Sequence, residues 1–205
     1  MTERLRVAAI CTIYHAWSHA DAIVTKFLKG MTTDEACHTP EADVVSMYID
    51  HILENDIGVG IAVDHGIPLY PSIRRALHAG ANQLNVDAVL FIGEHGDYPW
   101  NERGRHMYPR RYIFEQIAGV FSESGRSVPV FNDKHLAYDW TDARWMWDRA
   151  TELDIPLMAG SCLPLAWRRP WVEHEQGTAI DEALAIGFGG IEAYGYHTLE
   201  SLQCM

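Results

Sequence analysis

Apolar runs of strand length alternate with segments of helical periodicity along most of this 205-residue chain. The longer apolar runs are residues 6–14, 43–50, 86–93, 128–132 and 155–159, with a shorter one at 67–70. Helical spacing predicts helices over residues 18–28, 55–65, 73–78, 108–122 and 139–153. A strand that is apolar on both of its faces must be covered on both sides. We therefore predict an α/β fold of Rossmann type, a doubly wound parallel sheet with helices on both faces.

The character of the sequence changes after residue 170. We predict a Rossmann-like domain over residues 1–170 and the beginning of a second, α+β domain over residues 171–205. The second domain is reduced or truncated, because one strand and one helix cannot bury a core alone. Within it we expect a strand over residues 178–188 and a helix from Thr198. Its glycine-rich strand also suggests a homo-oligomer formed through this domain.

Charge and hydropathy restrict the class of partner. Sixteen Lys and Arg against 28 Asp and Glu give a formal net charge of −12, which repels phosphate backbones and anionic lipid. No apolar run approaches the roughly 18 residues of a membrane span, and no secretory apolar segment follows the N-terminus. We therefore expect a cytoplasmic protein that binds a small-molecule substrate, and neither nucleic acid nor a membrane. The four cysteines form no C-x-x-C pair, and we expect reduced thiols.

Reactive side chains follow most of the predicted strands at their carboxyl ends. The sets are Cys11 to His15, Asp50-His51, Glu94-His95, Asp133-Lys134-His135 and Ser161-Cys162. Each set alone would most often be a helix cap or a surface feature. Ligands of parallel α/β sheets bind beyond the carboxyl ends of the strands, so the convergence of these sets favours an active or binding site. Lys134 is a candidate acid, with simple pairing to Asp133 as the alternative.

An insertion over residues 96–109 follows the strand at 86–93 and could form a lid or part of the substrate pocket. The arginines in and after it are Arg103, Arg105, Arg110 and Arg111. They could bind an anionic substrate, but we expect them to belong to a solvated lid.

Several of these segments resemble the Gfo/Idh/MocA oxidoreductases, the relatives of glucose-fructose oxidoreductase and inositol dehydrogenase. In that family a strand leads to Glu-Lys-Pro, and a helix, a second strand and an arginine-containing turn follow. The matching segments here are Val128-Pro-Val-Phe-Asn-Asp-Lys-His, Ile155-Pro-Leu-Met-Ala-Gly-Ser and Arg168-Arg-Pro. Lys134 stands where the family's catalytic lysine stands. Gly195-Tyr-His197-Thr-Leu-Glu200 resembles the segment that carries the family's active-site histidine. The resemblance implies that Lys134 and His197 are catalytic and that the cofactor is NAD or NADP.

The resemblance also implies a cofactor site. Asp50 looks like the acidic residue that binds the cofactor ribose, and the strand ending at Gly93 and Glu94 looks like the one before the nicotinamide loop. The glycine positions of the family's phosphate loop are held here by Cys11, Ile13 and Ala16. A branched Ile13 should obstruct a dinucleotide unless the loop takes another course.

Two departures touch the chemistry that the resemblance implies. Asp133-Lys134-His135 replaces Glu-Lys-Pro, and Ala193 stands where the family has an Asp four residues before its His. The residues expected to bind the substrate are His95, Asp133, His135 and Arg168.

Three functions remain open from the sequence. The first is oxidation of a sugar or polyol, in which His197 abstracts the hydroxyl proton and Lys134 holds the oxygen; it needs no metal. The second is a non-catalytic or regulatory descendant of that family that still binds a small ligand. The third is a metal-assisted hydrolase, lyase or isomerase. Its ligands would come from His15, Glu94, His95, Asp133 and His135.

Overall fold

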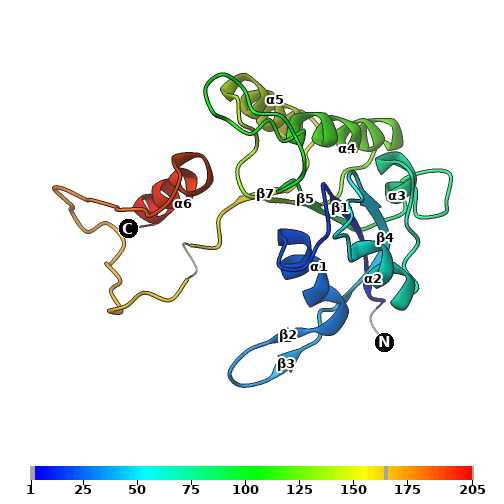
Figure 1. Cartoon of the computed structure of the whole chain (residues 1–205), viewed down its shortest axis with the longest axis horizontal. Helices are drawn as coiled ribbons and strands as arrows, with labels where there is room; N and C mark the ends of the chain where they lie inside the picture. Colours follow the sequence, from blue (N-terminus) through cyan, green and yellow to red (C-terminus); the bar gives the residue numbers. More distant parts are fainter. Residues whose placement is uncertain (1–2, 164–165, 205) are drawn as a thin grey trace.

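The parallel sheet predicted from the apolar runs is present. The computed structural model describes residues 3–163 and 166–204. The main sheet contains β1 (Leu5–Cys11), β4 (Ala42–Ile49), β5 (Ala88–Ile92), β6 (Val130–Asp133) and β7 (Leu157–Gly160). All of its strands are parallel, in the order β4-β1-β5-β6-β7 (Figure 1). The chain therefore has the α/β fold that its sequence predicts, a Rossmann-type doubly wound sheet.

Helices cover both faces of this sheet. They are α1 (His19–Lys29), α2 (Gly58–Asp64), α3 (Ile73–His78), α4 (Arg110–Ser124) and α5 (Trp140–Glu152). Val7 and Ala9 of β1 pack in the core cluster that includes α1 and α2, whereas Ala8 and Ile10 pack in the cluster with α3, α4 and α5. Alternate residues of one strand therefore enter two different cores, which is why the strand is apolar throughout.

Two of the smaller segments differ from a plain strand or loop. The predicted strand at 67–70 is a single parallel bridge between Leu69 and Met47 of β4. The two hydrogen bonds of this bridge run from Met47 N to Pro68 O and from Tyr70 N to Met47 O, and Pro68 has no N–H with which to extend the pairing. Before β4, a short hairpin pairs β2 (Met31–Thr32) with β3 (Cys37–His38).

The C-terminal segment departs most from its prediction. Within the described residues, 178–188 form no strand and pair with none of the sheet's strands; an unpaired strand leaves its N–H and C=O groups unsatisfied. The last helix, α6 (Ile191–Gln203), begins directly after Gly190 rather than at Thr198. It contains no buried residue and lies apart from α1 to α5 in Figure 1. None of the helices in the described part of the chain is long and apolar enough to cross a membrane.

Candidate functional site

The loops after the sheet strands meet at one edge of the sheet. After β1, the Thr12 hydroxyl donates to Glu94 O beyond β5 (2.7 Å), and Thr12 O accepts from His51 N beyond β4 (2.8 Å). Beyond β6, Lys134 O accepts from Gly160 N at the end of β7 (3.1 Å). The loops at the carboxyl ends of the strands thus meet at one edge of the sheet, where the topology predicts a ligand-binding crevice.

Lys134 and His197, the two residues expected to be catalytic, are in contact. Lys134 Nζ lies 2.7 Å from His197 Nε2, although 63 positions separate them in the sequence. His197 comes from α6, and its Nδ1 lies 2.7 Å from the hydroxyl of Ser161, which follows β7. Lys134, His197 and Ser161 form one hydrogen-bonded unit, here called the Lys–His–Ser cluster.

The backbone at Lys134 is held in an unusual conformation. Its φ is 73°, in the left-handed region that side-chain-bearing residues rarely adopt. The buried side-chain amide of Asn132 donates to Lys134 O and to His135 O, both at 3.2 Å. Such conformations persist where the surroundings fix them, and they gather at functional sites. The turn after β6 therefore fixes the direction of the Lys134 side chain.

The donors around His197 determine its tautomer. An ammonium group can only donate, so Lys134 Nζ–H donates to Nε2, and the ring proton lies on Nδ1, which donates to Ser161 Oγ. Burial, followed by the positive charge of Lys134, lowers the pKa of His197 from its ordinary value. The imidazole is therefore neutral at pH 7, with its basic nitrogen facing Lys134.

Three histidines gather beside Asp133. His19 Nδ1 lies 2.6 Å from Asp133 Oδ2. The ring of His95 meets that of His19 edge-on at a centroid distance of 5.1 Å, and it is tilted against the ring of His15 at 5.8 Å. Burial lowers the pKa of His95. Two residues expected to bind the substrate, His95 and Asp133, thus lie in one polar cluster. Across residues 3–163 and 166–204, no three or more His, Cys, Asp or Glu side chains are arranged to hold a metal ion.

Arg110 contradicts the expectation of a solvated arginine lid. Its side chain is fully buried at the start of α4, where it pairs with Glu94 and donates to His135 Nε2 at 3.0 Å. Gly93 makes room for it, since a Cβ there would lie 2.9 Å from Arg110 Cγ. Burial, and then the charge of Arg110, lower the pKa of His135 to about 3. In this structure Gly93 and Glu94, expected at the cofactor, both contact Arg110.

Asp50, the expected ribose ligand, already has two hydrogen-bond donors. The Tyr48 hydroxyl donates to Oδ1 at 2.6 Å and the Tyr98 hydroxyl to Oδ2 at 2.7 Å. Tyr98 belongs to the insertion, and its ring stacks on His51 with a centroid distance of 4.5 Å. The insertion therefore reaches the end of β4, a contact that no local sequence pattern signals.

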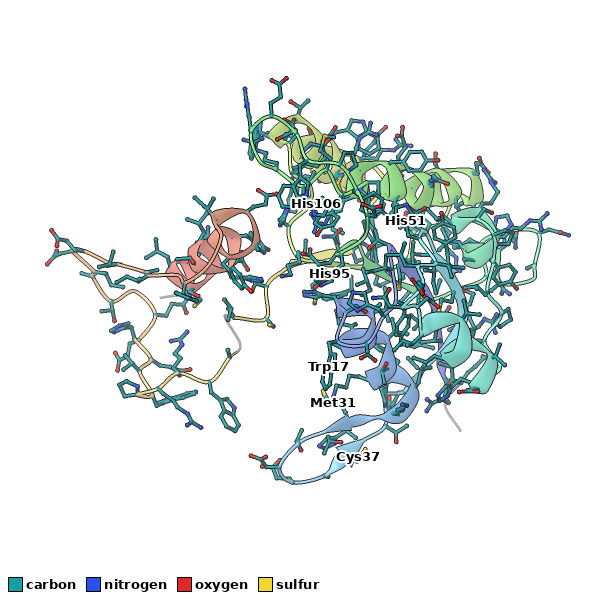
Figure 2. All side chains as sticks on the ribbon, in the orientation of Figure 1. Trp17, Met31, Cys37, His51, His95 and His106 are labelled. Atoms are coloured by element: carbon teal, nitrogen blue, oxygen red, sulfur yellow. The ribbon has the colours of Figure 1, made fainter. Side chains whose placement is uncertain are left out.

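The loop after β1 differs from a glycine-rich phosphate-binding loop. Ile13 is 4% exposed, and Cys11 is fully buried in the core around β1. Ala16 is exposed, and Trp17 is 94% exposed beside α1 (Figure 2). The carboxylate of Asp21, in the first turn of α1, accepts a hydrogen bond from Trp17 N at 2.9 Å. This carboxylate opposes the binding of a pyrophosphate at the helix N-terminus.

These contacts decide how well the residues suit NAD or NADP. The sheet topology provides the usual crevice for a dinucleotide. However, both oxygens of Asp50 are engaged, and Asp21 places a negative charge where the phosphates would lie. The residues present therefore do not fit the usual dinucleotide mode in this conformation.

Two cavities adjoin α6 and the ends of the strands. One, of about 700 Å³, is lined in part by Arg105 of the insertion, His135 and Tyr196. The other, of about 800 Å³, is lined by His197 and by much of the segment 178–188. Of the Lys–His–Ser cluster, only His197 lines this larger cavity.

Polar contacts hold α6 against this edge. They are Ser161 N to Glu200 Oε2 (3.0 Å) and His106 N to Glu192 Oε1 (3.0 Å). Away from this edge, Arg168 Nη2 donates to Cys204 O after the end of α6 (3.1 Å). Arg168 also donates to Val172 O and lines neither cavity. The structure thus places this expected substrate ligand at the far end of α6.

No protein-family model matches this chain, and no curated protein matches its sequence. Among solved structures, it is similar to a dehydrogenase (MviM) from Clostridium difficile, at 15% identity with a TM-score of 0.48, over 76% of this chain and 39% of that one. It is also similar to GenD2 from gentamicin A biosynthesis in complex with NAD, at 21% identity with a TM-score of 0.47, over 78% of this chain and 35% of that one.

A third similar structure is UDP-N-acetylglucosamine 3-dehydrogenase GnnA from Acidithiobacillus ferrooxidans, at 15% identity with a TM-score of 0.44. The match covers 78% of this chain and 39% of that one. The chain therefore spans less than half of the length of each of these three proteins.

Proposed function

We propose that the Lys–His–Ser cluster binds a hydroxyl group of a small sugar or polyol and accepts its proton, which is the acid–base half of a Gfo/Idh/MocA-type oxidation. The observation that carries the proposal is the 2.7 Å contact between Lys134 Nζ and His197 Nε2. The Gfo/Idh/MocA resemblance assigns catalysis to these two residues, and they come from separate elements of the fold. Their contact supports a shared role in handling one proton.

In this proposal the substrate hydroxyl enters between Lys134 and His197. His197 is neutral, so its Nε2 accepts the hydroxyl proton as a general base. The ammonium group of Lys134 then stabilises the negative charge on the oxygen. Ser161 positions the ring by accepting from Nδ1, which keeps Nε2 free of a proton. His95 and Asp133 would bind neighbouring hydroxyl groups.

Oxidation of the substrate carbon needs a hydride acceptor, for which the resemblance implies NAD or NADP. GenD2 is described in complex with NAD. Because Asp50 and the start of α1 do not fit the usual dinucleotide mode, the proposal assigns to this chain only substrate binding and proton transfer.

The second candidate is a regulatory descendant that binds the same ligand without turnover. The observation that favours it is the engagement of Asp50 by Tyr48 and Tyr98, which leaves the ribose site closed. Binding without turnover, in the presence of NAD and NADP, would identify this second function.

The test is a screen of sugars and polyols by ligand-detected NMR, followed by titration calorimetry of each binder with the full chain. We expect at least one binder, and about a tenfold or larger loss of affinity in Lys134→Met and in His197→Phe. Nicotinamide absorbance with the same compound distinguishes oxidation from binding alone.

Lys26→Met is the matched control, because Lys26 is an exposed lysine in the last turn of α1. It should leave the affinity unchanged. The proposal is wrong if no sugar or polyol binds, or if Lys134→Met and Lys26→Met bind the ligand equally well.

A further inference from the structure

We propose that Tyr98 occupies the place of a dinucleotide ribose at Asp50 and thereby restricts the crevice to ligands smaller than NAD. Tyr98 is then a specificity-determining residue of the insertion. This inference goes beyond the proposed function, since it concerns which ligands can enter and holds for any reaction at the Lys–His–Ser cluster.

The first argument is the saturation of Asp50. A carboxylate that binds a ribose accepts hydrogen bonds from its hydroxyl groups, and here two phenol hydroxyls provide them instead. Tyr48 donates to Oδ1 and Tyr98 donates to Oδ2, at 2.6 and 2.7 Å. Burial, with the adjacent carboxylate, raises the pKa of both phenols. Both therefore stay protonated as donors over the ordinary pH range.

The second argument is the fixed position of the Tyr98 ring. It stacks on His51 at 4.5 Å with an interplanar angle of 19°, and its edge contact with Tyr108 has a centroid distance of 5.9 Å. Tyr98 O accepts a hydrogen bond from His106 Nε2 at 2.9 Å. Gly96 has a φ of 122°, and a Cβ at that position would collide with Tyr98 Cε2. Only glycine allows the ring to fold back in this way.

The third argument is the anchoring of the insertion at its other end. His106 N donates to Glu192 Oε1 of α6 at 3.0 Å, and Arg105 Nη1 donates to Tyr138 O at 3.1 Å. The insertion thus runs from Asp50, at the end of β4, across to α6. Removing Tyr98 from Asp50 would disturb contacts along its length, so a dinucleotide must compete with a structured segment rather than a free loop.

The test measures NAD affinity of the full chain by titration calorimetry. For the wild type we expect no saturable binding below about 1 mM, the weak end of specific recognition. Tyr98→Ala should bind NAD at least about tenfold more tightly, because Asp50 becomes available to the ribose. Adding Asp50→Asn to Tyr98→Ala should remove the gain.

Gly96→Ala provides a second route that keeps the tyrosine. Its new methyl group displaces the ring from Asp50, so it should also strengthen NAD binding. The matched control is Tyr112→Ala, because Tyr112 is 62% exposed on α4; it should gain nothing. Circular dichroism and the Tm verify that each variant is folded.

Saturable binding of NAD to the wild type well below 1 mM would overturn the inference. The inference is also overturned if Tyr98→Ala and Gly96→Ala are folded and neither binds NAD more tightly than the wild type. The readout is affinity for NAD and needs no substrate, so it succeeds or fails independently of the sugar and polyol screen.

Discussion

Arg110 and Glu94 form a buried ion pair below the crevice. Removing one partner of such a pair leaves an uncompensated charge. We expect Arg110→Met to lower the free energy of unfolding by about 3–5 kcal/mol, measured by urea denaturation. The double variant with Glu94→Gln should be less destabilised than Arg110→Met alone, because the orphaned charge is gone. Additive losses would contradict this account.

The control for Arg110 is an arginine that also pairs with a carboxylate but is exposed to solvent. Arg144 pairs with Asp148 one turn later on α5, and its side chain is 62% exposed. Arg144→Met should cost less than about 0.5 kcal/mol, as is usual for exposed pairs within one helix.

His135 makes stability depend on pH. Its folded pKa is about 3, whereas its ordinary value is 6.5. Above pH 6.5 neither the folded nor the unfolded state binds the proton; below it only the unfolded state does, so stability falls as the pH drops toward 3. The slope for one group is at most about 1.4 kcal/mol per pH unit. His135→Gln should flatten the curve of unfolding free energy against pH between 6.5 and 4.5. An unchanged slope would contradict this assignment.

The burial of Arg110 had a signal in the sequence. Arg110 precedes Ile113, Phe114 and Ile117 at the spacing of one helix face, and all three are buried in the core. As an arginine, Arg110 was expected to be exposed to solvent, but its position on the apolar face of the helix indicated that its side chain is buried. The contact of Tyr98 with Asp50 had no such signal, because 48 positions separate the two residues and only the folded sheet brings them together.

At the scale of elements, α6 belongs to the site more than to the core. Both hydrophobic clusters are complete by Leu157, and α6 buries no residue. We expect residues 1–170 alone to unfold cooperatively, with a Tm within about 4 °C of the full chain, the shift that about 1 kcal/mol produces at this size. Calorimetry measures both properties. Loss of a cooperative transition would show that the C-terminal segment is part of the core.

The reliability of the element predictions followed the strength of their periodic signal. The strands of the main sheet and α1 to α5 were predictable, because their apolar residues repeat with the period of a strand or a helix. The strand expected at 178–188 was not, because a strand is stable only beside a partner strand, and whether a partner is available depends on the whole fold. The sequence could place Lys134 at the end of a strand. It could not predict the link from Lys134 through His197 to Ser161, because that link depends on where α6 lies against the sheet.

At the scale of the whole molecule, the C-terminal segment exposes a row of large apolar side chains. Leu184, Ile186, Phe188 and Ile191 are each between 86% and 97% exposed. Contiguous exposed apolar residues commonly mark association surfaces, and we expect the chain to self-associate through them. Sedimentation velocity over a range of concentrations should show an oligomer that Ile186→Asp with Phe188→Asp converts to a monomer. A wild type that stays monomeric throughout would refute this expectation.

Trp17 gives the molecule an optical reporter at the rim of its crevice. Its indole is 94% exposed beside the start of α1, so a dissolved quencher reaches it freely. A ligand seated against this rim would shield the indole and lower the quenching constant, whereas one confined between Lys134 and His197 would leave it unchanged. Comparison with Trp17→Phe isolates the signal of Trp17, and its quenching constant then reports whether a bound molecule extends as far as the start of α1.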